Sequence, residues 1–397
     1  MSEHESEAKV GHGHSHSARL NLRPDDRRRV IAILAAIVVP LALATLVGLA
    51  IFWPRATTPV GSVQLADTGV QMAVGQVTSI GVMDELGQTR VMMKVDGVDV
   101  PVHVPFDVVG NGLDVGDSIK AMFNPGALDT GSPYIFVDFV RDVPLAALAA
   151  LYVLVVVLVA RWKGFAALLG LGSSLAVVAL FMLPALMAGS SPIGVVTVGA
   201  SAMMFSSIYF AHGVSIRTTT AVLGTLGGLV LTGLLAVFAV RANNLTGTLS
   251  DDAVSLAGQL GYLQMSDILL CGIILAGLGA LNDVTITQVS TVWELHSANE
   301  QASRRRIFRQ AMVIGRDHIA STVYTLAFAY VGTSLPLLMS AALVDRGFLD
   351  LLTVGQIAEE IVRTLVASVG LVLAIPMTTA IAAMLAPVAP ARKVIDV

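Results

Sequence analysis

Residues 30–53 read VIAILAAIVVPLALATLVGLAIFW, an apolar run that directly follows three arginines at positions 27–29. A transmembrane helix needs about 20 mostly apolar residues, and this run contains no charged side chain. It is too long for the apolar core of a signal peptide, and no small-x-small cleavage pattern follows at residues 53–55. The run therefore predicts an uncleaved first transmembrane helix.

The composition of the whole chain agrees with this interpretation. Of its 397 residues, 55% are hydrophobic and only 13% are charged, whereas soluble chains carry about 25% charged residues. The net charge of −4 argues against a nucleic-acid binder with a broad basic face. Cys271 is the only cysteine, which excludes an intramolecular disulfide framework and a Cys-rich metal site. We therefore expect an integral membrane protein rather than a soluble enzyme.

Seven further apolar runs follow the first, so that about eight transmembrane helices are expected in a polytopic all-α bundle. The sixth run is short and must be extended by neighbouring polar residues to cross the membrane. The runs cover 144–160, 165–188, 193–209, 218–240, 268–281, 319–341 and 361–387. Seven of the eight helices would form one transmembrane domain over residues 143–390.

The basic residues predict the orientation, because cytoplasmic loops retain Lys and Arg. With the N-terminus inside, the inner segments hold 16 of the 24 basic residues. These are Lys9, Arg19, Arg23, Arg27, Arg28, Arg29, Arg161, Lys163, Arg217, Arg304, Arg305, Arg306, Arg309, Arg316, Arg392 and Lys393. Both termini are therefore expected in the cytoplasm, including a short tail at residues 391–397.

Residues 54–142 change character completely. Alternating apolar and polar residues at 91–95 and 98–104 are separated by Gly and Asp, and the stretch 114–120 is typical of a turn that leads into a strand. Short strands at this spacing predict a small β-rich domain outside the membrane, an OB-like or other small barrel. It shows no aromatic stacking platform, so nucleic-acid binding has no support.

The first 29 residues are polar and contain His12, His14 and His16. Imidazoles this close together are weak candidates for binding a divalent transition metal. The composition favours a disordered cytoplasmic tail that binds metal only adventitiously, so no lasting cofactor is implied.

Three clusters of polar residues lie in or beside the last three predicted helices. Ionisable groups at membrane depth are expensive and usually face a partner or a water-filled path. The first cluster forms a stripe on one helix face, because its members are spaced four, three and four residues apart. It consists of Asp283, Thr287, Ser290 and Glu294.

The second cluster is Arg316, Asp317 and His318 at the start of the seventh helix. We expect Asp283 and Asp317 to face each other, with Arg316 or His318 supplying the counter-charge. An aspartyl dyad that shares a proton is the alternative, but a neighbouring Arg favours two charged carboxylates.

The third cluster is Glu359, Glu360 and Arg363 at the start of the eighth helix. Glu359 and Arg363 are four residues apart in the order that favours an ion pair. For the second and third clusters, simple anchoring or neutralisation of a helix end is the competing interpretation.

The same segments resemble a known family. The run 279–284 with Glu294, the segment 315–326 and the segment 360–370 are similar to motifs of the YibE/F-like family of bacterial membrane proteins. The His-Gly-His tail adds to a resemblance that covers nearly the whole chain. Tyr324 departs from it, since Asn is expected there. The resemblance implies a multi-pass protein of the bacterial cell membrane with an extracytoplasmic domain, and it carries no settled activity.

The leading hypothesis for function is transport of a small solute or ion. Because no Gly-x-x-x-x-Gly-Lys-Ser/Thr loop exists, the driving force would be a gradient rather than nucleotide hydrolysis. Asp283 and Asp317 would be inner coupling groups, and Glu360 and Arg363 would form an outer gate. The alternative is a scaffold or sensor whose β domain binds an envelope partner. Motifs of intramembrane hydrolases are missing, so no enzyme is expected.

The orientation can be tested by labelling single cysteines with an impermeant thiol reagent in intact cells. Cysteines that replace Asp67 and Asp129 should react from outside, because both positions lie in the long outer segment. A cysteine that replaces Ser303 should react only after the membrane is permeabilised. Labelling of Ser303 alone in intact cells would invert the topology.

Overall fold

Long apolar runs become long helices in this chain, because backbone in lipid must satisfy its own hydrogen bonds. The computed structural model describes residues 23–55, 58–61, 71–83, 87–126, 133–345 and 347–387. The histidines of the tail and positions 67 and 129 lie outside them. The chain forms two units, Pro59–Phe165 and a helical unit of Met1–Thr58 with Ala166–Val397. Each unit is described by itself.

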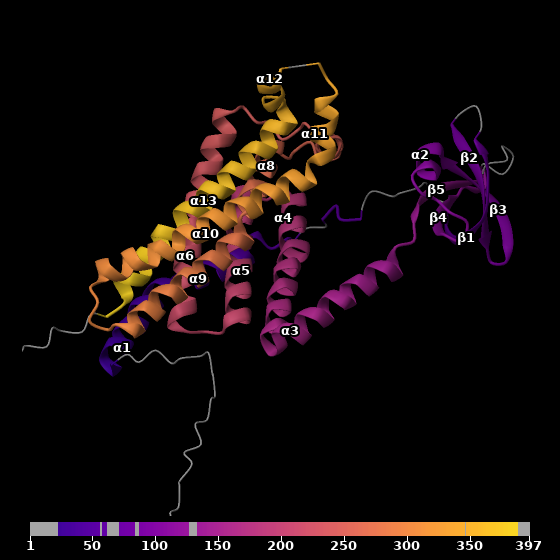
Figure 1. Cartoon of the computed structure of the whole chain (residues 1–397). Helices are drawn as coiled ribbons and strands as arrows, with labels where there is room; N and C mark the ends of the chain where they lie inside the picture. The colour runs from indigo at the N-terminus through magenta and orange to yellow at the C-terminus, as the bar shows by residue number, and fades with distance from the viewer. Residues whose placement is uncertain are drawn as a thin grey trace, which may run out of the picture. The chain divides into compact units, whose positions relative to one another are not determined.

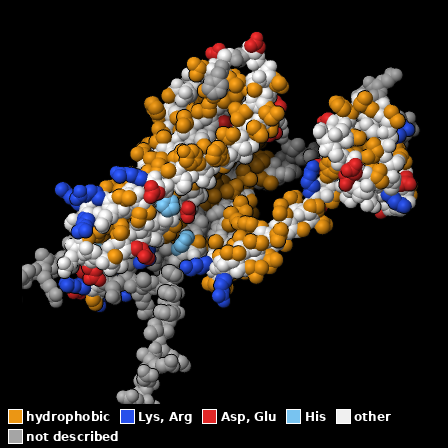
Figure 2. Space-filling model, in the orientation of Figure 1, with side chains coloured by type: hydrophobic (Ala, Val, Ile, Leu, Met, Phe, Trp, Pro, Cys, Tyr) orange, Lys and Arg blue, Asp and Glu red, His pale blue; other side chains and the backbone are white. Residues whose placement is uncertain are grey.

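The helical elements are drawn in Figure 1. Their bounds are α1 Pro24–Phe52, α2 Phe106–Gly110, α3 Asp142–Val177 with a π-helical turn at Val178–Met182, α4 Leu183–Met187, α5 Pro192–His212, α6 Ile216–Ala242, α7 Asp251–Gln259, α8 Met265–Ala276, α9 Leu278–Ala298, α10 Arg304–Thr333, α11 Leu335–Ala342, α12 Phe348–Leu352 and α13 Gly355–Leu385. Hydrophobic side chains cover much of the visible surface of the helical unit (Figure 2), as expected for helices that face lipid.

Among the described residues, six helices are long and apolar enough to cross a membrane, or seven if α10 and α11 form one bent span. The expected number was eight. If α10 and α11 count as one span, the remaining difference of one span arises at Asp142–Met187, which counts as one helix of 46 residues. Its backbone leaves helical geometry at Arg161, where φ is 53° and ψ is −132°. This interruption lies between the apolar runs 144–160 and 165–188, which the sequence predicts as two separate transmembrane helices.

Polar residues extend the sixth predicted span, as the sequence requires. Gly277 ends α8, and α9 continues with Asn282 and Asp283. The two helices together give a span of 34 residues. Gly277 is therefore a break between the two helices of this span.

The β-rich domain is a closed barrel of five strands. The strands are β1 Gln71–Met83, β2 Gln88–Val95, β3 Val98–Pro105, β4 Ser118–Phe123 and β5 Tyr134–Phe139. Their order is β1-β2-β3-β5-β4, with β4 antiparallel to β1 and β3 parallel to β5. Helix α2 connects β3 to β4. This order is that of an OB-type barrel, and the prediction of a small β-rich domain after the first helix is confirmed.

Alternation along the strands builds the barrel's core. Val91 and Met93 on β2 and Val102 and Val104 on β3 are completely buried, while their sequence neighbours face outward. Ile119 on β4 closes the core from the opposite side. The period of two that the sequence shows at 91–95 and 98–104 therefore matches the inward and outward faces of the barrel.

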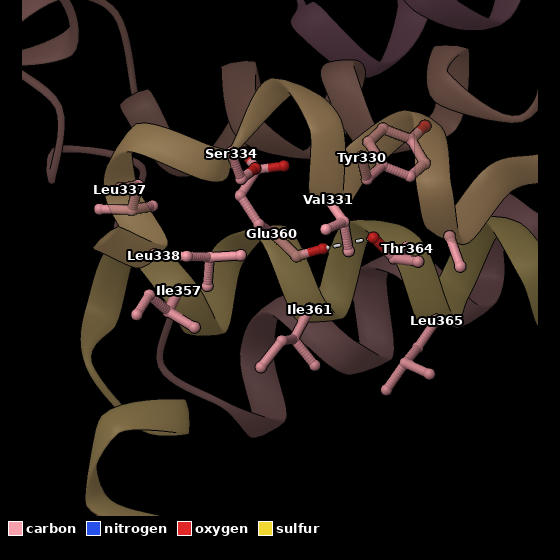
Figure 3. Close-up of a pocket in the computed structure, with 11 residues that line it drawn as sticks. Tyr330, Val331, Ser334, Leu337, Leu338, Ile357, Glu360, Ile361, Thr364 and Leu365 are labelled. Carbon is pink, nitrogen blue, oxygen red and sulfur yellow. Dashed lines mark hydrogen bonds between the residues drawn. The ribbon is translucent and has the colours of Figure 1, made fainter. Parts of the chain in front are cut away.

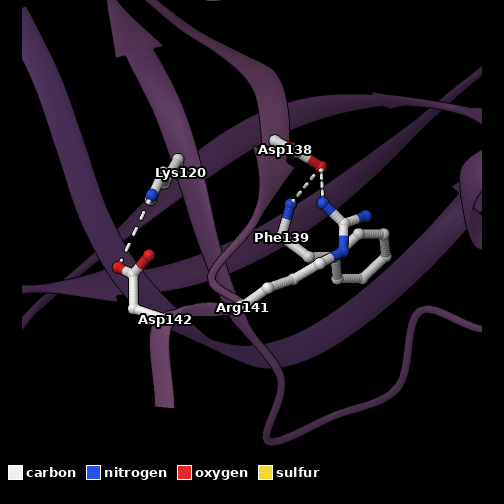
Figure 4. Close-up of polar contacts among 5 residues, drawn as sticks. All are labelled: Lys120, Asp138, Phe139, Arg141 and Asp142. Carbon is white, nitrogen blue, oxygen red and sulfur yellow. Dashed lines mark hydrogen bonds and ion pairs between the residues drawn. The ribbon is translucent and has the colours of Figure 1, made fainter. Parts of the chain in front are cut away.

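Two ion pairs lie where the barrel leads into α3 (Figure 4). Lys120 Nζ is 3.6 Å from Asp142 Oδ2, and Arg141 Nη1 is 2.7 Å from Asp138 Oδ1. The backbone N–H of Phe139 also donates to Asp138 Oδ1. This N–H and the Arg141 guanidinium hold the pKa of Asp138 below its usual value. Since these side chains are largely exposed, they orient the junction more than they stabilise it.

The helical unit is built around α6, α9 and α13, which pack against one another. Glycines allow this close approach. An added Cβ at Gly224 would lie 2.3 Å from Thr378 Oγ1, and one at Gly370 would lie 2.0 Å from Thr232 Oγ1. Gly224 and Gly228, a small-xxx-small pair, therefore serve helix packing. Gly172 on α3 does not, because nothing lies within 4 Å of its added Cβ.

We expect Gly224→Ala to lower the free energy of unfolding by about 1–3 kcal/mol, because the new methyl group overpacks the contact with α13. Gly172→Ala is the matched control. It adds the same methyl group to open space, and alanine favours a helix by up to about 1 kcal/mol. Thermal unfolding in detergent measures both. Equal stability of the two variants would contradict the packing role of Gly224.

Candidate functional site

A groove of about 230 Å³ lies between α13 and the bend where α10 meets α11. The two helices meet at Ser334 at an angle of 64°. Pro336 in the first turn of α11 has no N–H to continue the helix, which explains the break. In Figure 3, side chains from α10 and α11 lie opposite those from α13. The walls are mostly aliphatic, and the polar groups on them are Tyr330, Ser334, Glu360 and Thr364.

Glu360 forms an ion pair at the edge of this groove. Its Oε1 lies 3.0 Å from Arg363 Nη1, and both side chains are about three-quarters buried, at 27% and 29% exposure. Arg363 Nε is buried and has no hydrogen-bond partner in the described part of the chain. A charged pair with a spare donor is therefore held beside an otherwise apolar surface.

The expected ion pair between Glu359 and Arg363 is wrong. Glu359 instead accepts a hydrogen bond of 3.0 Å from the backbone N–H of Gly247. Glu360 and Arg363 are three residues apart in the sequence, and residues at this spacing are neighbours on a helix. Arg363 therefore pairs with the carboxylate of Glu360, which the loop does not engage.

The loop after α6 fixes this end of α13. Gly247 has φ of +70°, and an added Cβ there would lie 2.3 Å from the Met265 carbonyl oxygen, so only glycine fits. The Gln356 side chain also donates to the Leu249 carbonyl oxygen. The loop contacts therefore hold Glu359 on one side of α13 and leave Glu360 free to line the groove.

The first and second clusters lie largely on the surface of the helical unit. Asp283, Arg316 and Asp317 are exposed, and His318 is partly buried. Among the described residues, the carboxylate of neither aspartate forms a hydrogen bond or an ion pair. The expected counter-charge from Arg316 or His318 is therefore not formed in this structure. The hydroxyls of Ser321 and Thr322 bond the His318 carbonyl oxygen of their own helix.

Glu294, at the end of the Asp283 stripe, forms an ion pair with Arg217 at the start of α6. Glu294 Oε1 lies 3.2 Å from Arg217 Nη1. Thr287 is partly buried, and its carbonyl oxygen accepts a hydrogen bond from the Thr291 hydroxyl. The stripe is thus an outer face of α9 whose last residue is tied to α6.

The opposite face of α9 carries polar groups that the sequence analysis missed. Thr285 Oγ1 lies 2.6 Å from Thr225 Oγ1 on α6, and Asn282 Nδ2 donates to Ser207 Oγ on α5 at 2.9 Å. Gln288 Nε2 donates to the Ala311 carbonyl oxygen on α10 at 3.0 Å. Their position in the helical repeat could have predicted this burial, because these polar residues share a face with the buried apolar residues of α9.

Besides Arg363 Nε, four buried polar atoms of α9 and α13 have no hydrogen-bond partner among the described residues. They are Asn282 Oδ1, Trp293 Nε1 and His296 Nδ1 on α9 and Thr378 Oγ1 on α13. A small cavity of about 10 Å³ lies nearby, lined in part by Thr232 and the break at Gly277. We use the name polar seam for seven residues of α6, α9 and α13 that bring buried polar atoms into the interior of the helical unit. They are Thr225, Thr232, Asn282, Thr285, Gln288, Thr378 and Thr379. Among the described residues, no group of three or more His, Cys, Asp or Glu side chains is placed to hold a metal ion.

A family model described as YibE/F-like protein matches residues 148–388. The chain belongs to the YibE/F-like family. The match includes 241 of 397 residues, so it is narrower than the resemblance expected from the sequence. The groove at Glu360, the Asp283 stripe and the polar seam lie within residues 148–388, whereas α1 and the barrel lie outside this range. No curated relative and no solved structure matches the chain.

We expect Glu360→Gln and Arg363→Gln each to lower the free energy of unfolding by roughly 1–2 kcal/mol. Each change leaves a mostly buried charge without its partner, and the effect is smaller than the about 3–5 kcal/mol of a fully buried pair. The double variant should recover most of this loss, since no unpaired charge remains. Thermal unfolding in detergent measures all three.

Arg241→Gln serves as the control for these variants. Arg241 is exposed near the end of α6 and forms no ion pair within the described residues. Its replacement should leave stability within about 0.5 kcal/mol of the parent protein. Additive losses in the double variant would show that Glu360 and Arg363 do not act as a pair.

Proposed function

We propose that this YibE/F-like protein is a gradient-driven membrane transporter for a small solute or ion, and not an enzyme. The observation that carries the proposal is the mostly buried ion pair of Glu360 and Arg363 at the edge of a groove beside a broken helix. Transporter sites are commonly formed at discontinuous helices, and ionisable groups within a span usually mark a pathway. The aliphatic walls around the pair favour a ligand that is small and partly apolar, or an ion that loses most of its water.

Eight crossings fit the helices best. A helix of 46 residues would be about 69 Å long at 1.5 Å per residue, more than twice the roughly 30 Å of hydrocarbon. The interruption at Arg161 supports two crossings there, and the bent pair α10–α11 supplies another. An even number of crossings agrees with the proposal that both termini lie in the bacterial cytoplasm and the barrel lies outside.

The polar seam supports a route between the two ends of the helical unit. The sequence places hydroxyls such as those of Ser321, Thr325 and Ser368 between the inner aspartates and Glu360. The buried hydroxyl and amide groups of α6, α9 and α13 add donors and acceptors in the interior. We propose that Asp283 and Asp317 act as coupling groups at the inner end of this route.

One observation favours the alternative function, a scaffold or sensor whose barrel binds an envelope protein. Met72 and Val74 on β1 and Ile135 and Val137 on β5 are exposed, and Met72 and Ile135 both pair with Met122 on β4. An apolar patch across three strands can bind a protein partner. In this case the helical unit would only anchor the barrel.

Flux measurements in proteoliposomes decide between the two functions. We expect proton or solute flux under an imposed pH gradient or membrane potential, and its loss in Glu360→Gln and in Asp283→Asn with expression near normal. Both substitutions remove the charge and keep the size of the side chain. Glu300→Gln, an exposed position after α9, is the control that should retain flux. A wild-type protein without flux under any gradient would leave the scaffold as the function.

A further inference from the structure

A second groove lies at the other end of α13, where α10 begins. It has a volume of about 470 Å³. Three arginines line it, Arg304, Arg305 and Arg309, and its apolar surface comes from Phe308 on α10 and from Ala380 and Met384 on α13. We call it the arginine groove. It is separate from the groove at Glu360, which lies at the first turns of α13.

Within the part of the chain that the structure describes, the arginines of this groove form no ion pair with an acidic side chain. Arg304 Nε donates to the carbonyl oxygen of Ala386, at the end of α13. Among the described residues, neither Arg305 nor Arg309 forms an ion pair, and the first turn of α10 contains no acidic residue. Arg305 and Arg309 are four residues apart, and like charges at this spacing repel each other. Figure 2 shows Lys and Arg side chains gathered over the N-terminal part of α10.

The shape and charge of the groove fit one kind of occupant. Guanidinium groups bind phosphate through paired charge-assisted hydrogen bonds, and basic pockets between transmembrane helices bind anionic headgroups. The apolar side chains beside the arginines suit the acyl chains of the same molecule. We propose that the arginine groove binds the headgroup of an anionic phospholipid, with the phosphate between Arg304, Arg305 and Arg309.

A general attraction of arginines to an anionic membrane can be distinguished from specific binding in the arginine groove. The arginines at positions 27–29 also begin a membrane-spanning helix and are exposed, but they are not among the residues that line the arginine groove. They give a matched control with the same number of arginines at the start of α1. Specific binding should depend on Arg304, Arg305 and Arg309, whereas general attraction to an anionic membrane should depend on both sets alike.

The test uses the full chain purified in a neutral detergent and titrated with dioleoylphosphatidylglycerol, with binding followed by native mass spectrometry. Dioleoylphosphatidylcholine and inorganic phosphate are titrated in parallel. We expect the R304Q/R305Q/R309Q variant to bind phosphatidylglycerol at least about tenfold more weakly than the parent, because one charge-assisted hydrogen bond is worth about that factor. The R27Q/R28Q/R29Q variant should bind like the parent.

Ala380→Leu tests the site without changing charge. Ala380 lines the groove from α13 and is only partly buried, so a larger side chain should obstruct the lipid and weaken binding. This variant keeps the proposal testable if the triple variant does not fold. Equal binding by the two triple variants, or unchanged binding by Ala380→Leu, would overturn the proposal. Competition by inorganic phosphate at equal concentration would also overturn it, since the groove would then be a site for the free anion.

Discussion

The close contact of α6 with α13 is the constraint on which the rest of the helical unit depends. In lipid the hydrophobic effect does not drive helices together, so association relies on tight packing of small residues. Gly224 faces Thr378, and Gly370 faces Thr232, so each helix offers a glycine to a threonine of the other. This reciprocal fit lies beside α9, which packs against both helices, and brings buried polar groups of the three helices together. Larger side chains at either glycine would separate the helices that form the polar seam.

The sequence predicted the classes of element better than their partners. Uncharged runs such as 30–53 predicted helices, because length and apolarity alone decide whether a segment can cross a membrane. The alternation at 91–95 and 98–104 likewise predicted strands, since a barrel buries every second side chain. These patterns are local, and they need no knowledge of neighbouring elements.

Pairing between side chains could not be read in the same way. Glu359 and Arg363 have suitable spacing, but the N–H of Gly247 comes from a loop more than 100 residues away and captures Glu359. Arg217 and Glu294 also pair across a long stretch of sequence, 77 residues. For α9, the sequence predicted the charged stripe but not the buried polar face. A charged residue in an apolar run is unusual in itself, whereas an Asn or Thr is common both on the surface and in the interior of a membrane helix. The candidate site was therefore predicted by residue and only partly by geometry.

The hydrogen bonds of α13 have a mechanical consequence. Within the described residues, hydrogen bonds to other elements form only near its ends. The side chains of Gln356 and Glu359 bond the loop after α6. At the other end, the carbonyl oxygen of the C-cap residue Ala386 accepts a hydrogen bond from the Arg304 side chain. Between these ends, hydroxyls such as those of Thr364 and Thr379 bond carbonyl oxygens of α13 itself. In contrast, α9 is bonded along its length to α5, α6 and α10. A helix that is hydrogen-bonded to its surroundings at both ends resists sliding along its axis. Twisting of the segment between these ends about the helix axis is therefore the movement of α13 that breaks the fewest hydrogen bonds to other elements.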